Sequence, residues 1–61
     1  MPIDSSAIIH ESAKIHKDAV ISAYALVGAN VEIGAGTVID SHAVIEGPTK
    51  IGKNNHIYSF A

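Results

Sequence analysis

The chain of 61 residues contains no cysteine, which excludes a disulfide bond and a thiolate metal site. Its apolar runs are only a few residues long, whereas a membrane span needs about twenty. Cationic residues are limited to four lysines that are spread along the sequence, and the net charge is −2. We therefore expect neither an integral membrane protein nor a nucleic-acid partner. The first residues, MPIDSSAIIHESAKIHK, do not show a basic start followed by an apolar run, so no secretory signal is expected.

An aliphatic residue occupies every sixth position of the chain. These residues are Ile3, Ile9, Ile15, Ile21, Val27, Ile33, Ile39, Ile45, Ile51 and Ile57. The residue two places before each of them is small in nearly every repeat. Residues two apart on a strand face the same way, so each hexapeptide predicts a three-residue strand with two inward side chains and a corner after it. A period of six does not match a helix and predicts an all-β parallel β-helix.

Three hexapeptides per turn predict triangular coils, about three and a half of them over residues 1–61. Stacking residues eighteen apart sorts the outward residues onto three faces. One face carries Pro2, Val20, Val38 and His56, the next Ile8, Leu26 and Val44, and the third Lys14, Glu32 and Lys50. The third face alternates in charge and suits water, whereas the first two are largely apolar. The corner between the two apolar faces carries Ser6, Tyr24, His42 and Phe60.

A contiguous apolar strip predicts a subunit interface, and two adjacent faces with their shared corner fit a closed three-fold ring. We therefore expect a homotrimer. The predicted interface residues are Ile8, Val20, Tyr24, Leu26, Val38, His42, Val44, His56 and Phe60. The alternative is that the outward valines reflect only the preference of branched residues for strands.

The candidate acid–base residues are four histidines, and no two of them stack at eighteen-residue spacing. They are His10, His16, His42 and His56. His42 and His56 could approach a neighbouring subunit and bind a metal, but packing at an interface is the expected role. One column contains Asp4, Ser22, Asp40 and Tyr58. We expect corner hydrogen bonds in this column rather than an acid–base pair. Asn30, Asn54 and the glycines are expected at left-handed corner positions. No catalytic residue, metal site or cofactor is predicted.

Each aliphatic position from Val27 to Ile51 is followed by Gly, Asp or Glu, and this pattern resembles the hexapeptide-repeat acyltransferases. The segments GPTKIG (47–52) and NNHIYSFA (54–61) are similar to the UDP-N-acetylglucosamine O-acyltransferase family. The resemblance implies left-handed coiling. It also implies a cytoplasmic enzyme of lipid A biosynthesis that moves a 3-hydroxyacyl chain from acyl carrier protein to UDP-N-acetylglucosamine. In that family the general-base histidine lies in later coils. Residues 1–61 are thus expected to be an N-terminal β-helix fragment that is inactive alone.

Two alternatives remain open on the sequence. The first is a non-catalytic β-helix module that only trimerises. The second is a carbonic-anhydrase-like hexapeptide protein that binds zinc between subunits. Stoichiometric retention of zinc would separate the second alternative from the acyltransferase fragment.

Overall fold

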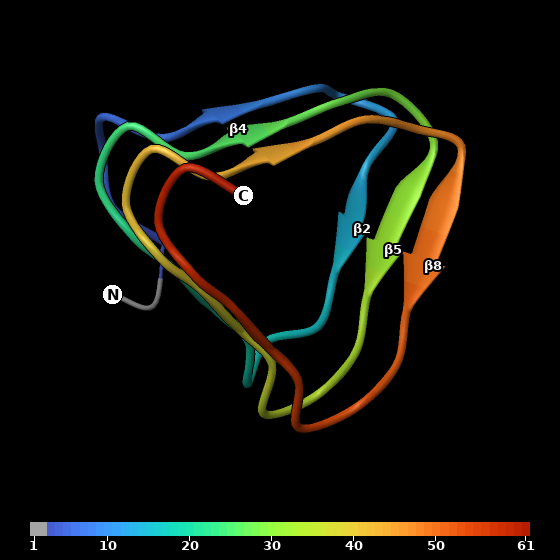
Figure 1. Cartoon of the computed structure of the whole chain (residues 1–61). Helices are drawn as coiled ribbons and strands as arrows, with labels where there is room; N and C mark the ends of the chain where they lie inside the picture. Colours follow the sequence, from blue (N-terminus) through green and yellow to red (C-terminus); the bar gives the residue numbers. More distant parts are fainter. Residues whose placement is uncertain (1–2) are drawn as a thin grey trace.

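The computed structural model describes residues 3–61, which form a three-sided coil of short strands (Figure 1). The nine strands are β1 (Ile8–Ile9), β2 (Lys14–Ile15), β3 (Val20–Ile21), β4 (Leu26–Val27), β5 (Val31–Ile33), β6 (Val38–Ile39), β7 (Val44–Ile45), β8 (Thr49–Ile51) and β9 (His56–Ile57). The strands form three parallel sheets, ordered β1-β4-β7, β2-β5-β8 and β3-β6-β9. This arrangement is the left-handed parallel β-helix that the sequence predicted.

The register confirms the eighteen-residue coil. Ile8 pairs with Leu26, which pairs in turn with Val44, and the other two sheets keep the same offset. Ile3 bridges to Ile21 in the first coil. The three outward faces therefore have the predicted members, except that Pro2 lies outside the described residues.

Seven of the nine strands are two residues long, one residue shorter than predicted. The missing residue is the small inward one, because its amide closes the preceding corner instead. The amides of Ala7, Ala13 and Ala19 donate to the carbonyls of Asp4, His10 and His16, at 3.0, 2.9 and 2.9 Å. Each of these small residues therefore completes a corner, and the strand begins at the residue that follows it.

The core is a column of inward aliphatic side chains. Its buried members are Ala19, Ile21, Ala25, Val27, Val31, Ile33, Ile39, Ala43 and Ile45. Ile9, Ile15, Ile51 and Ile57 pack against this cluster but are only partly buried. Thr37 is the buried polar residue of the described chain, and its hydroxyl donates to the carbonyl of Gly52 at 2.6 Å. The middle coil therefore holds the best-packed part of the core.

The left-handed corner positions are only partly those predicted. Asn30, Asn54 and Gly36 have positive φ angles, as expected, but the remaining glycines do not. Gly34 is needed for close approach instead, because a Cβ there would lie 2.8 Å from the carbonyl carbon of Gly52. Three further left-handed positions were not predicted, and they carry Tyr24, His42 and Phe60, with φ between 60° and 63°. Within residues 3–61 there is no helix that could cross a membrane.

Candidate interaction surface and charged groove

Three aromatic side chains stack in a column at one corner of the coil. The rings of Tyr24 and His42 have centroids 5.3 Å apart at 28°, and those of His42 and Phe60 are 5.3 Å apart at 20°. Each residue follows the previous one after eighteen positions and adopts the same left-handed backbone, so the side chains leave the coil in parallel. Tyr24 is 65% exposed and Phe60 is 81% exposed. We call these three residues the aromatic corner.

The sheets on either side of the aromatic corner expose aliphatic side chains. Sheet β1-β4-β7 presents Ile8, Leu26 and Val44, and sheet β3-β6-β9 presents Val20, Val38 and His56. Ile8 is 65% exposed, Val44 48% and Val20 40%. The fold thus brings all nine predicted interface residues onto one continuous surface, which we call the apolar surface. Its role as a subunit interface stays a prediction.

One polar pair lies at the margin of the apolar surface. Nε2 of His56 is 2.9 Å from Oδ2 of Asp40, and the His56 ring stacks on Tyr58 with centroids 4.1 Å apart. The side chain of His56 is 43% exposed and that of Asp40 is 31% exposed. Asp40 was expected to form corner hydrogen bonds and instead binds a histidine from the next coil. The two are diagonal neighbours, so stacking residues eighteen apart does not reveal the pair.

Asp4 follows the expected pattern of a corner hydrogen bond. Its Oδ1 atom accepts from the hydroxyl of Ser6 at 2.7 Å and from the amide of Ser6 at 2.9 Å. The hydroxyl bond, followed by the amide bond, lowers the pKa of the Asp4 carboxyl below its ordinary value. Asp4 and Asp40 therefore have separate partners and do not act as an acid–base pair.

His10 and His16 also close corners. Nδ1 of His10 accepts from the amide of Ser12 at 3.1 Å, and Nδ1 of His16 accepts from the amide of Asp18 at 3.0 Å. Each imidazole therefore has the same role as the Asp4 carboxylate one or two corners earlier. Across residues 3–61, no group of three histidine, aspartate or glutamate side chains is arranged to hold a metal ion.

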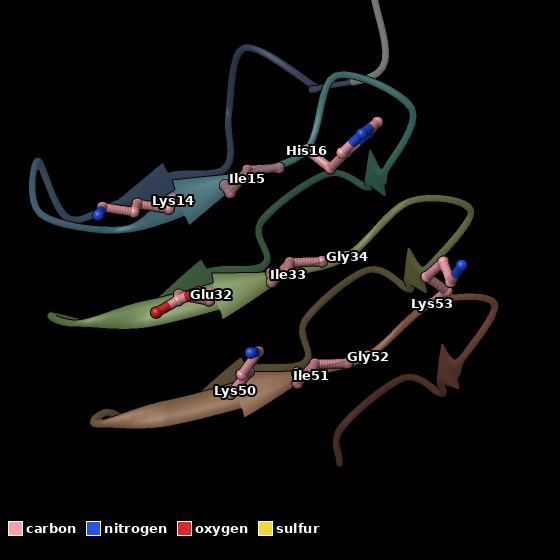
Figure 2. Close-up of a pocket in the computed structure, with 10 residues that line it drawn as sticks. All are labelled: Lys14, Ile15, His16, Glu32, Ile33, Gly34, Lys50, Ile51, Gly52 and Lys53. Carbon is pink, nitrogen blue, oxygen red and sulfur yellow. The ribbon is translucent and has the colours of Figure 1, made fainter.

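A shallow groove of about 410 Å³ runs along the face opposite the aromatic corner (Figure 2). Figure 2 shows Lys14, Glu32 and Lys50 on neighbouring strands of sheet β2-β5-β8, and His16 and Lys53 at the corner that follows. The bare backbones of Gly34 and Gly52 lie between these two groups. Lys17 belongs to the same corner, because steps of eighteen residues lead from Lys17 to Ala35 and then to Lys53.

All four lysines of the chain therefore lie on one face and its following corner, although they are spread out in the sequence. We call Lys14, Lys17, Lys50 and Lys53, with Glu32 between them, the lysine face. This cluster was not predicted from the sequence. The sequence contains the signal for it, because stacking residues eighteen apart places Lys17 in the same column as Lys53.

The described side chains do not assemble an acyl-transfer site. That chemistry needs a base close to the attacking hydroxyl and donors for the oxyanion. The Asp40–His56 pair could act as a base, but it lies on sheet β3-β6-β9, whereas the groove lies on sheet β2-β5-β8. What the described residues offer is two surfaces, one apolar and one cationic.

Residues 30–61, just over half of the chain, match the family described as bacterial transferase hexapeptide (six repeats). The chain belongs to this family. A comparison with curated protein sequences found no match.

Two solved structures are similar over almost the whole chain. One is UDP-N-acetylglucosamine O-acyltransferase (LpxA) from Moraxella catarrhalis, with 50% identity and a TM-score of 0.96 over 98% of this chain. The other is LpxA from Acinetobacter baumannii, with 48% identity and a TM-score of 0.95 over 98% of this chain. In both cases the match spans 23% of the length of the solved chain. The resemblance predicted from the hexapeptide pattern and the GPTKIG and NNHIYSFA segments is thereby confirmed.

Proposed function

We propose that these residues are the N-terminal β-helix portion of an acyltransferase. The reaction would move a 3-hydroxyacyl chain from acyl carrier protein to UDP-N-acetylglucosamine, an early step of lipid A biosynthesis in the cytoplasm. The observation that carries this proposal is 48–50% identity over 98% of the chain to structures of LpxA. The match spans only 23% of the length of these solved chains, so most of such an enzyme lies outside the comparison. The catalytic base would therefore come from residues other than these.

A chimaera tests this proposal. Residues 1–61 would replace the matching segment of the Moraxella catarrhalis enzyme, and transfer of a radiolabelled 3-hydroxyacyl group from acyl carrier protein to UDP-N-acetylglucosamine would be measured. The chimaera should retain transfer within about tenfold of the intact enzyme, and the 61-residue chain alone should show none. A folded chimaera without activity would count against the proposal.

We also propose that the chain assembles as a homotrimer through the apolar surface. The exposed fractions of Ile8, Tyr24, Val44 and Phe60, between 48% and 81%, would leave a large apolar area in water if the chain were monomeric. Two adjacent faces that share a corner suit a three-fold ring, because each subunit can present one face to each neighbour. The lysine face would then point outward.

Sedimentation equilibrium tests the trimer. The chain should sediment at three times its mass of 6.3 kDa. Leu26→Lys adds one positive charge to the apolar surface and should produce the monomer. The matched control is Glu32→Gln, which raises the net charge by the same amount on the lysine face and should leave the trimer intact. A folded monomer at high protein concentration for the unmodified chain would rule the trimer out.

A further inference from the structure

The lysines of the chain all lie on one side of the coil. The whole chain carries four lysines and six carboxylates, for a net charge of −2. The lysine face and its corner hold all four lysines but only two carboxylates, those of Glu32 and Asp18, so this region has a net charge of +2. Glu11 and Glu46 lie at the corner that precedes this face, and Asp4 and Asp40 lie further around the coil. One side of an acidic molecule is therefore cationic.

The lysine charges are not neutralised within the described chain. There, the two contacts within 4.0 Å between a basic side-chain nitrogen and a carboxylate oxygen join His16 to Asp18 and His56 to Asp40, and neither includes a lysine. Glu32 is paired in register with Lys14 on one side and Lys50 on the other, yet no lysine nitrogen of residues 3–61 comes within 4.0 Å of a carboxylate oxygen. The ammonium groups consequently remain free to meet a partner.

The spacing of the lysines favours an extended ligand. Lys14 and Lys50 are two rungs apart on their sheet, and so are Lys17 and Lys53 at the corner. Strands in a sheet are separated by about 4.8 Å, so each pair is about 10 Å apart at the backbone. One phosphate is too small to bridge such pairs. Side chains on one side of an extended peptide recur about every 7 Å, and the peptide can therefore reach several lysines in succession.

The surroundings favour a protein over a membrane. Glu32 lies in the middle of the face and would repel a layer of anionic lipid, whereas a peptide can place a neutral or basic residue opposite it. The large exposed apolar side chains, such as Leu26 and Phe60, point away from this face, so a membrane would find no apolar anchor here.

We propose that the lysine face is a docking surface for an acidic segment of a partner protein. The groove between the Lys14–Glu32–Lys50 column and the His16–Lys53 corner would receive the backbone of that segment, and the lysines would bind its carboxylates. The inference depends on the proposed trimer in one respect, namely that the trimer leaves the lysine face on the outside. It does not depend on the acyltransferase reaction.

Fluorescence anisotropy with a fluorescein-labelled octaglutamate peptide tests the proposal on the 61-residue chain at 50 and 300 mM salt. Lys14→Gln, Lys50→Gln and Lys53→Gln should each weaken binding by about 1.5- to 5-fold, the range of single exposed ion pairs. Glu32→Gln should strengthen binding by a similar factor. The higher salt concentration should weaken binding for every variant.

The matched control is Glu11→Gln, which raises the net charge by the same unit as Glu32→Gln but at the corner that precedes the lysine face, outside the groove and outside the apolar surface. It should leave the affinity unchanged at 300 mM salt. Equal strengthening by both variants would show a net-charge effect and overturn the proposal. Lysine-dependent binding to phosphatidylglycerol vesicles without binding to octaglutamate would overturn it in favour of a membrane. Sedimentation of the same variants separates a loss of the trimer from a loss of peptide binding.

Discussion

The imidazole of His56 and the carboxylate of Asp40 meet across adjacent coils, with 2.9 Å between Nε2 and Oδ2. His56 is an outward residue of β9, and Asp40 is the first residue after β6, the strand on which β9 stacks. The pair thus joins two coils at a place where the backbone ladder ends. Stacking of Tyr58 on the imidazole fixes the ring that makes this contact.

A double-mutant cycle should detect coupling between these two side chains. We expect His56→Ala and Asp40→Ala to show a coupling free energy of unfolding of up to about 1 kcal/mol, because both groups are partly exposed. Urea unfolding at constant protein concentration gives the four free energies. A His56→Ala and Glu46→Ala cycle serves as the control and should show no coupling.

The buried hydroxyl of Thr37 holds two coils together. It donates to the carbonyl of Gly52 at 2.6 Å and accepts from the amide of Asn55 at 3.3 Å. Thr37→Val keeps the shape but leaves both backbone groups without this partner, so the free energy of unfolding should fall by about 1–2 kcal/mol. Thr49 is the matched control, since its hydroxyl also donates at 2.6 Å, to the carbonyl of Glu46, but in an exposed position. Thr49→Val should cost less than about 0.5 kcal/mol, and equal costs would contradict the argument.

The sequence was enough to predict the coil because the aliphatic period and the eighteen-residue stack constrain every strand. The pairing of Ile8 with Leu26 follows directly from that stack. Contacts between residues of different columns were not predictable in this way, and the His56–Asp40 pair is one of these contacts. The backbone of His42 was not predictable either, because a left-handed aromatic residue is locally unfavourable. The His42 ring stacks on Tyr24 and Phe60, and this tertiary contact accompanies the left-handed backbone.

The carboxyl of Asp4 should titrate below its ordinary value near 3.8, because the hydroxyl and then the amide of Ser6 donate to the charged form. A lowered pKa in the folded state means that this contribution to stability is complete above the pKa of the unfolded chain. It is lost as the pH falls through the lower folded pKa. Carbon-13 NMR titration of the carboxyl measures the value. Ser6→Ala should move the pKa back toward 3.8, and an unchanged pKa in that variant would contradict the assigned cause.

Removal of the His10 imidazole should weaken the corner that it closes. Nδ1 of His10 accepts from the amide of Ser12 at 3.1 Å, and His10→Ala leaves that amide without its side-chain acceptor. The hydrogen-exchange protection factor of the Ser12 amide should therefore fall severalfold in His10→Ala, after correction for the intrinsic exchange rate.

The variant His10→Asp gives this corner the acceptor that Asp4 supplies to Ser6. The Ser12 amide should then keep the protection that it has in the unmodified chain. The Ser6 amide provides an internal control and should not change in either variant. Loss of protection in His10→Asp equal to that in His10→Ala would assign the effect to general loosening of the first coil.

The left-handed backbone at His42 predicts an unusual order of stability for substitutions. His42→Ala and His42→Gly both remove the stack with Tyr24 and Phe60, but only alanine keeps a Cβ at a φ of 63°. The left-handed conformation costs an L-residue about 1–2 kcal/mol, and the greater freedom of glycine in the unfolded chain offsets part of the relief. We expect the glycine variant to be more stable than the alanine variant by about 0.5–1 kcal/mol in urea unfolding. At the neighbouring Ser41, whose φ is not positive, alanine should be the more stable of the two. The same order at both positions would show that the backbone at His42 is not under steric constraint.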